Sequence, residues 1–128
     1  MKGLHVAIIM DGNRRYAQKK HLQPGEGHKK GAENVGKIIR WAQELGIGQL
    51  TLYSFSLDNF KRTRKEVKLL MELFRKKLKE LKEAKNVEDK KIRVRFIGRT
   101  QRFPKDIREA MKKLVEKTKR NKRLTINF

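Results

Sequence analysis

Short apolar runs alternate along this chain with longer segments in which apolar residues recur every three or four positions. The short runs have the length of buried strands, and the longer segments have the period of amphipathic helices. Gly46 is placed to end one of these helices, and Pro104 is a favourable first-turn residue for another. We predict strands at 6–10, 49–55, 92–97 and 123–128, and long helices at 27–45, 64–84 and from Pro104 onward.

This alternation predicts an α/β fold with a parallel sheet flanked by helices. Strands joined by helices run parallel through right-handed crossovers, and such sheets are normally covered on both faces. The 128 residues suffice for one core and show no internal repeat, so we expect a single domain over 1–128. Ligands bind such sheets outside the carboxyl ends of the strands, where polar side chains should therefore gather.

Composition narrows the class of partner. Thirty-five Lys and Arg against 14 Asp and Glu give a formal net charge of +21, which fits a nucleic acid, an anionic membrane surface or a phosphate-bearing substrate. Solvated helix faces of a Lys- and Glu-rich protein explain the same charge. The absence of cysteine excludes disulfides and thiolate metal sites. The N-terminus leads straight into a strand-like run without a signal peptide, so we expect a cytoplasmic protein.

A polar cluster follows the first predicted strand, at Asp11-Gly12-Asn13-Arg14-Arg15. Asp is a hard oxygen ligand for Mg²⁺, and the guanidinium group of Arg is a planar fork for phosphate oxygens. Gly12 permits close backbone approach, and the N-terminus of a short helix near Arg14 favours an anion. Taken alone, Asp11 is better explained as the N-cap of that helix. Together the residues favour a site for a diphosphate and a divalent metal ion.

A second polar cluster follows the second predicted strand and contains Ser56, Asp58, Asn59 and Arg62. Each of these residues alone is explained as a turn or cap residue. Because the carboxyl ends of parallel strands meet at one edge of a sheet, we expect both clusters to face one cleft.

Two helical features bear on the same cleft. His28 begins the helix at 27–45 and can reach the cleft, although an isolated His is more often a surface residue; His5 and His21 are taken as structural. The helix at 64–84 carries an apolar stripe of Leu70, Met71, Phe74 and Leu78. The simplest interpretation of this stripe is core. If part of it faces the cleft, it forms an apolar channel suited to an amphiphile with a diphosphate head.

Ordered motifs along essentially the whole chain resemble those of the cis-prenyltransferases, the undecaprenyl and dehydrodolichyl diphosphate synthases. The blocks that carry the resemblance are His5 to Ala17, Gly27-His28 with Gly31-Ala32, Trp41-Ala42 with Leu45-Gly46-Ile47, Leu50 to Ser56 with Asn59 and Arg62, Glu66-Val67 with Leu70-Met71, and Ile97-Gly98. The resemblance implies a transferase that adds isopentenyl diphosphate to an allylic diphosphate in cis geometry. It also implies Mg²⁺, a hydrophobic tunnel for the product, and a fold unlike the all-α trans-prenyltransferases.

The resemblance implies roles for single residues as well. Asp11 would bind Mg²⁺ and the diphosphate, and Asn13 or Asn59 would help to remove the proton. Because a carboxamide is a weak base, the departing diphosphate is the alternative proton acceptor. The implied substrate-binding residues are Gly12, Asn13, Arg14, Arg15, Tyr16, His28, Phe55, Ser56, Leu57, Asp58, Phe60 and Arg62.

The chain departs from the family pattern in three places. Pro24 stands where the family usually has an Arg, and Asp58 where it usually has a Glu. The segment 124–128 matches the beginning of a later family strand, so we expect a fold truncated after the fourth predicted strand. Beyond that strand, the family carries an Arg-rich segment for isopentenyl diphosphate and a carboxylate that completes the Mg²⁺ site across the dimer. We therefore expect a fragment, a split or heteromeric enzyme, or a degenerate relative.

The sequence supports three functional hypotheses. The first is a prenyltransferase domain that keeps the allylic half of the site and works as a homodimer, or as a heteromer with a chain supplying the Arg-rich segment, with peripheral membrane contact. The second is a noncatalytic or degenerate subunit of a heteromeric prenyltransferase. The third, a basic nucleic-acid-binding domain, rests on net charge alone and ranks last, because aromatic residues make up only 7% of the chain and form no evident stacking platform.

Overall fold

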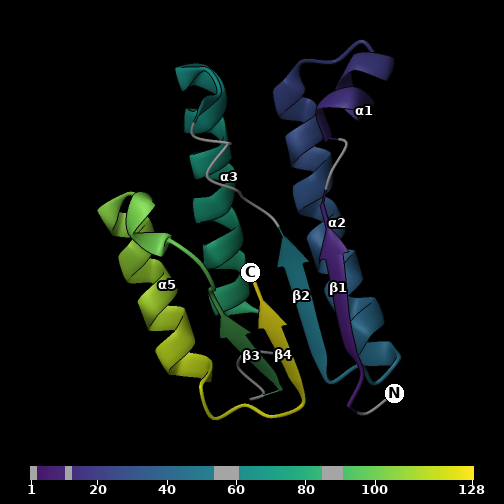
Figure 1. Cartoon of the computed structure of the whole chain (residues 1–128), viewed down its shortest axis with the longest axis vertical. Coiled ribbons are helices and arrows are strands. Elements are labelled where there is room, and N and C mark those ends of the chain that lie inside the picture. Colours follow the sequence, from purple (N-terminus) through teal and green to yellow (C-terminus); the bar gives the residue numbers. More distant parts are fainter. Residues whose placement is uncertain (1–2, 11–12, 54–60, 85–90) are drawn as a thin grey trace.

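The computed structural model describes residues 3–10, 13–53, 61–84 and 91–128. The predicted strands and helices are confirmed, with small shifts at their ends. α2 begins at Pro24, earlier than predicted, because proline suits the first turn of a helix, where its missing N–H costs no hydrogen bond. In chain order (Figure 1) the elements are β1 (His5–Ile9), α1 (Asn13–Lys19), α2 (Pro24–Glu44), β2 (Gln49–Tyr53), α3 (Arg64–Glu83), β3 (Ile92–Arg95), the 3₁₀ turn η2 (Thr100–Arg102), α5 (Lys105–Thr118) and β4 (Leu124–Asn127).

Gly46 ends α2, as the sequence predicted. Gly46 has a φ of 71°, in the left-handed region that residues with a Cβ atom rarely occupy. This conformation lets the N–H groups of Gly46 and Ile47 donate to the carbonyl oxygens of Gln43 and Ala42. The chain can therefore leave the helix and turn directly into β2.

The strands form one parallel sheet in the order β1-β2-β4-β3. Its register places Val6, Leu50, Ile126 and Val94 in one row across all four strands. The predicted α/β architecture with a parallel sheet is thereby confirmed.

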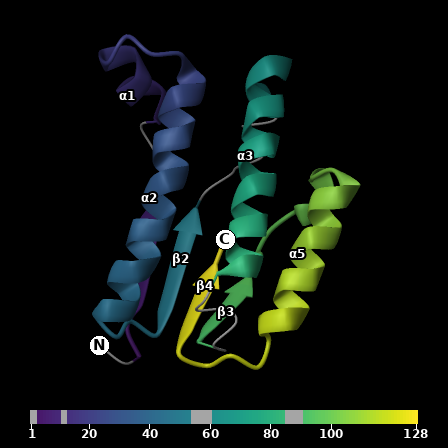
Figure 2. The same ribbon diagram turned by 180° about the vertical axis from the view of Figure 1, so that it is seen from behind.

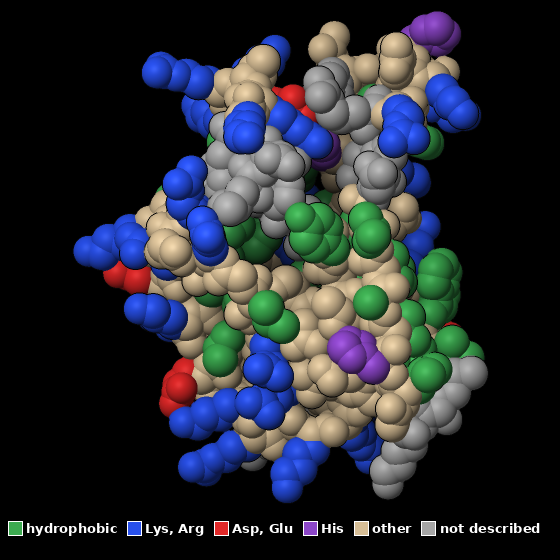
Figure 3. Space-filling view, viewed as in Figure 1, with side chains coloured by type: hydrophobic (Ala, Val, Ile, Leu, Met, Phe, Trp, Pro, Cys, Tyr) green, Lys and Arg blue, Asp and Glu red, His purple; other side chains and the backbone are tan. Residues whose placement is uncertain are grey.

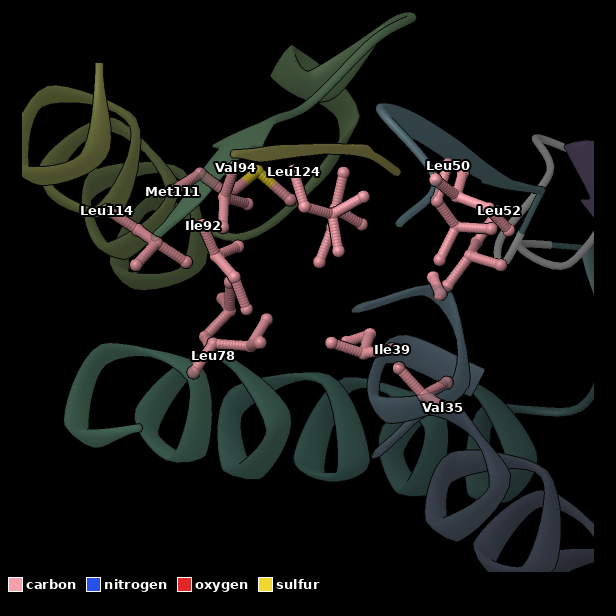
Figure 4. Close-up of a cluster of buried hydrophobic side chains, with 14 of the residues drawn as sticks. Val35, Ile39, Leu50, Leu52, Leu78, Ile92, Val94, Met111, Leu114 and Leu124 are labelled. Atoms are coloured by element: carbon pink, nitrogen blue, oxygen red, sulfur yellow. The ribbon is translucent and has the colours of Figure 1, made fainter. Parts of the chain in front are cut away.

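One face of the sheet is apolar and carries the hydrophobic core. Side chains from α2 and α3 point at alternate residues of the strands across this face (Figure 4). Met71 and Leu78 of the predicted helical stripe are buried here, which confirms the core interpretation for these two residues. The core also includes Val35, Ile39, Leu50, Leu52, Leu81, Ile92, Val94, Ile107, Met111, Leu114, Leu124 and Ile126.

The opposite face of the sheet is open over β1 and β2, so the prediction that helices cover both faces is wrong for this part of the described chain. His5, Ala7 and Ile9 of β1 and Tyr53 of β2 are exposed there. Figures 1 and 2 show α2 and α3 together on the other side. The reason is topological: the connections from β1 to β2 and from β2 to β3 cross the sheet in the same direction, and crossovers of one hand then lie on one face.

The two edges of the sheet differ. α5 lies along β3, where the hydroxyl of Thr118 accepts from the N–H of Val94 and the side chain of Asn121 donates to the carbonyl of Ile92. At the other edge, Leu4 and Met10 flank β1. The carbonyl of Leu4 accepts from the N–H of Gln49 in β2, and the N–H of Met10 donates to the carbonyl of Tyr53. Because backbone groups of successive strand residues point to opposite sides, those of His5, Ala7 and Ile9 face outward. Within the described residues nothing pairs with them. No described helix combines the length and apolarity that a membrane span requires.

Candidate active site

The two strands that precede the predicted polar segments end side by side. Ile9, near the end of β1, pairs with Tyr53 at the end of β2, so the chain leaves both strands at neighbouring points. This arrangement supports the prediction of a shared cleft. The backbones of Asn13 and Arg14 begin α1. The remaining predicted residues of these segments, Asp11, Gly12, Phe55, Ser56, Leu57, Asp58, Asn59 and Phe60, lie outside the described residues.

The described part of the site is a polar cluster of His28, Arg62 and Glu66, which we call the His-Arg-Glu cluster. Nε2 of His28 lies 2.9 Å from Oε1 of Glu66, and Nη1 of Arg62 lies 3.2 Å from the same oxygen. The Nη1 to Nε2 distance is 3.5 Å. His28 and Glu66 are only 7% and 8% exposed, whereas the Arg62 side chain is 28% exposed. The structure therefore brings together His28 and Arg62, which the sequence placed near one cleft.

Local structure explains how this cluster forms. α2 carries His28 in its second turn, and α3 carries Glu66 in its first turn. Thr63 is the N-cap of α3, and its hydroxyl accepts a hydrogen bond from the N–H of Glu66 at 3.2 Å. Arg62 immediately precedes that cap. The neighbouring starts of α2 and α3 thus bring side chains from distant parts of the sequence into contact.

Glu66 is a site residue that sequence reasoning missed. The resemblance included it as part of a motif block, without a role. Its Thr63-x-x-Glu66 spacing is that of a capping box, which is by itself a sufficient local explanation for a glutamate at this position. Only the approach of α2 to α3 shows that its carboxylate meets a histidine and an arginine.

Arg15 and Tyr16 lie in α1, and both are exposed. α1 packs against α2, with Ala17 buried at 1% exposure. This packing holds α1 beside the helix that carries His28. The substrate-binding roles that the resemblance implies for Arg15 and Tyr16 remain predictions.

An apolar cavity of about 110 Å³ extends from His28 between α2, α3 and the sheet. Met10, Leu70 and Phe74 line it, together with Phe96 and Phe128. The Phe96 and Phe128 rings stack with centroids 5.7 Å apart, and the Phe74 and Phe96 centroids are 6.5 Å apart. This space is smaller than the roughly 150 Å³ that holds one benzene-sized hydrocarbon, so it has room for only a small apolar group. Part of the helical stripe therefore lines a cavity that also includes His28 of the polar cluster.

The described residues contain no group of three or more His, Cys, Asp or Glu side chains that could hold a metal ion. The predicted Mg²⁺ ligand, Asp11, lies outside those residues. Positive charge is unevenly spread: on the face in Figure 3, Lys and Arg gather mainly around the periphery, and few lie over β1 and β2. The net charge thus does not form one continuous basic surface on this face.

Comparison with known proteins identifies relatives along nearly the whole chain. Residues 9–128 match the family model described as undecaprenyl diphosphate synthase. The tritrans,polycis-undecaprenyl-diphosphate synthase (geranylgeranyl-diphosphate specific) of Methanocaldococcus jannaschii is 46% identical over 124 residues, which cover 97% of this chain and 44% of the relative. The protein of the same name from Archaeoglobus fulgidus is 40% identical over 123 residues, covering 96% of this chain and 49% of the relative.

A solved structure agrees with the sequence relatives. The lavandulyl diphosphate synthase from Lavandula x intermedia, in complex with dimethylallyl diphosphate, superposes with a TM-score of 0.83 at 33% identity. The match covers 96% of this chain and 52% of that chain. The chain thus spans about half the length of the proteins that it matches.

Proposed function

The chain belongs to the undecaprenyl diphosphate synthase family of prenyltransferases, and from this premise we propose that it forms the allylic-diphosphate half of a cis-prenyltransferase site. The complete site condenses isopentenyl diphosphate with an allylic diphosphate to make a cis-polyprenyl diphosphate. The observation that carries the proposal is that His28 lines an apolar cavity and has Arg62 beside it. Polar donors beside an apolar channel suit a diphosphate head with a prenyl tail.

The chemistry requires stabilisation of a leaving group. The bond between C1 of the allylic substrate and its diphosphate breaks, and C1 bonds to C4 of isopentenyl diphosphate. A proton then leaves C2 of the added unit. Negative charge develops on the departing diphosphate, so donors held nearby lower the barrier. Arg14, Arg15, Arg62 and His28 supply these donors in the proposal.

The proton acceptor is the departing diphosphate, positioned with the help of Asn13 or Asn59. Asp11 is the proposed ligand for Mg²⁺, because a carboxylate at a strand end suits a hard divalent ion. When bound, Mg²⁺ adds positive charge against the leaving group. The substrate contacts of Gly12, Tyr16, Phe55, Ser56, Leu57, Asp58 and Phe60 are part of the same proposal.

A second polypeptide segment completes the site in this proposal. It supplies the Arg-rich group for isopentenyl diphosphate, in a homodimer or a heteromer. The outward-facing backbone of β1 and the open face over β1 and β2 support a partner that adds to the sheet at this edge. The same observation favours the second candidate function, a noncatalytic subunit of a heteromeric prenyltransferase.

We place the assembly in the cytoplasm with peripheral contact to the membrane. The formal net charge of +21 attracts anionic lipid headgroups, and a polyprenyl product partitions into lipid.

Calorimetric titration with farnesyl diphosphate and Mg²⁺ tests the proposal. The wild-type chain should bind, and Asp11→Ala should bind at least about tenfold more weakly, a loss of about 1.4 kcal/mol. Asp106→Ala is the matched control, because this exposed carboxylate pairs with Arg75 on the far side of α3. Absence of wild-type binding, or equal binding by wild type and Asp11→Ala, would sink the proposal. Robust chain elongation by the purified 128 residues alone would contradict the need for a completing segment.

A further inference from the structure

We infer that Glu66 is a positioning residue of the diphosphate site: its buried carboxylate holds His28 in a single tautomer and holds the guanidinium of Arg62 beside it. The inference rests on the proposed function, because it takes a diphosphate as the ligand of His28 and Arg62. Glu66 itself carries negative charge and does not touch the diphosphate.

The tautomer follows from the contacts of Glu66. Two acceptors cannot sit 2.9 Å apart without a proton between them, so one proton lies between Oε1 of Glu66 and Nε2 of His28. The guanidinium of Arg62, 3.2 Å from the same oxygen, favours the ionised carboxylate. The proton therefore resides on Nε2, which donates to Glu66. The 3.5 Å approach of Arg62 to Nε2 is then a contact between two donors and not a hydrogen bond.

This arrangement leaves Nδ1 of His28 for another partner. Nδ1 makes no hydrogen bond within the described residues, while Nε2 is fully engaged by the carboxylate. A histidine held by one ring nitrogen presents the other in a defined direction, as carboxylate–histidine pairs do in metal sites. When protonated, Nδ1 is a directed donor for a phosphate oxygen.

Arg62 benefits from the same carboxylate in a different way. Guanidinium has five N–H donors in a rigid plane. Glu66 engages Nη1, and the partial exposure of Arg62 lets the rest of the fork reach a ligand. A long side chain anchored at one end loses less conformational freedom when it binds. Glu66 thus fixes the orientation of both side chains before the ligand arrives.

A purely structural role is the competing explanation. Glu66 lies in the first turn of α3, where a negative charge is favourable with respect to the helix dipole, and its spacing from Thr63 is that of a capping box. In that case its replacement lowers stability but leaves His28 and ligand affinity unchanged. The two explanations therefore differ in measurable ways.

The ligand-free chain provides the first test. Long-range ¹H–¹⁵N spectra distinguish the two imidazole tautomers, and His5→Gln and His21→Gln variants identify the His28 signals. Wild type should show the Nε2–H tautomer alone, and Glu66→Ala a mixture of both tautomers. A wild-type spectrum dominated by Nδ1–H overturns the inference, even if Glu66→Ala fails to fold. An unchanged His28 spectrum in folded Glu66→Ala also overturns it.

Ligand binding provides the second test, by calorimetry with farnesyl diphosphate and Mg²⁺. Glu66→Gln should weaken binding about tenfold, although removing a negative charge near an anion would otherwise tighten it. Glu80→Gln is the control on the same helix, since its carboxylate pairs with Lys77, and its affinity should stay within about twofold of wild type. In the His28→Gln background, Glu66→Gln should have at least a threefold smaller effect, because coupled residues are not additive.

Equal effects of Glu66→Gln in the two backgrounds, or unchanged affinity in Glu66→Gln, contradict the inference. If the wild-type chain does not bind farnesyl diphosphate, the proposed function fails, and the diphosphate role of Glu66 fails with it. The tautomer spectra separate the two claims. If wild type then shows the Nε2–H tautomer and Glu66→Ala loses it, Glu66 does position His28, and only the choice of a diphosphate as the ligand is wrong.

Discussion

Burial makes the contacts between Glu66, His28 and Arg62 stronger than those of an exposed ion pair. An exposed ion pair contributes little, because water already solvates both charges. Glu66 is 8% exposed and must instead be paired with Arg62 and His28, so these side chains are held in place before any ligand binds. The site chemistry therefore depends on two helix starts that are far apart in the sequence.

The exposed pair of Arg75 and Asp106 provides a contrast and a pH-dependent prediction. Nε of Arg75 lies 2.6 Å from Oδ2 of Asp106, and this hydrogen bond holds the pKa of Asp106 below its ordinary 3.8. A lowered folded-state pKa contributes stability above pH 3.8 that is lost as the pH falls through the folded-state value. Asp106→Asn should therefore lower the melting temperature slightly at neutral pH, and the difference from wild type should shrink below pH 3.8.

Thermal unfolding followed by circular dichroism measures this difference. Glu109→Gln is the control. Its carboxylate is exposed and lies 4.0 Å from Nζ of Lys105, which is too far for a strong ion pair. A difference between wild type and Asp106→Asn that grows as the solution is acidified would contradict the assignment.

At the scale of single elements, we expect replacement by alanine to have opposite effects on stability at Gly36, inside α2, and at Gly46, just after its end. Gly36 lies in the middle of the helix with open space where a Cβ atom would stand, whereas Gly46 needs its left-handed φ of 71°. Gly36→Ala should stabilise the protein by about 0.5–1 kcal/mol, because alanine favours a helix interior. Gly46→Ala should destabilise it by about 1–2 kcal/mol, because the left-handed conformation is strained for alanine. Urea denaturation measures both changes in the free energy of unfolding. Changes of the same sign would show that backbone conformation does not determine the effect of these substitutions.

The hydroxyl of Thr118 is one of the two side-chain groups that cover the edge of β3. Thr118 is fully buried, and its Oγ1 accepts from the N–H of Val94 at 3.0 Å and donates to the carbonyl of Leu114 at 2.9 Å. Thr118→Val keeps the shape but leaves the N–H of Val94 unpaired, so we expect a loss of about 1–3 kcal/mol in the free energy of unfolding. Thr118→Ser keeps the hydroxyl and should lose less. The hydrogen-bond explanation fails if Thr118→Ser is the more damaging substitution in urea denaturation.

At the scale of the whole molecule, the two sides of the sheet differ. The helical side carries the hydrophobic core and the apolar cavity, while the side over β1 and β2 exposes Ile9 at 75% and Tyr53 at 59% beside an unpaired strand edge of the described chain. Apolar surface of this kind favours association, whereas the net charge of +21 opposes it. Salt screens the repulsion and leaves the apolar attraction.

We therefore expect self-association that increases with salt concentration. A chain carrying both Ile9→Lys and Tyr53→Lys should associate more weakly in sedimentation velocity experiments. A chain carrying Trp41→Lys and Leu45→Lys provides the control, since it removes similarly exposed apolar groups at the end of α2. Equal weakening by the two pairs, or association that decreases with salt, would show that the open face is not the contact surface.

The elements and the parallel sheet could be predicted because their signals are local. The period of apolar residues, Pro104 near a helix start, and Gly46 at a helix end depend on neighbours within a few residues. The ordered motifs also identified the family, which the match over residues 9–128 confirms. Asp11, Asn13 and Asn59 remain predictions, since the described residues do not test their roles.

By itself, then, the sequence determined the α/β class, the family and the end of the sheet where polar groups gather. Only the tertiary structure decided that Glu66 meets His28 and Arg62, that Phe74 lines a cavity while Met71 fills the core, and that one face stays open. The physical reason is the separation along the chain over which each kind of interaction acts. Helix and strand propensities act between neighbouring residues, whereas burial, tautomer and exposed surface depend on strand order and on side chains brought together from distant segments.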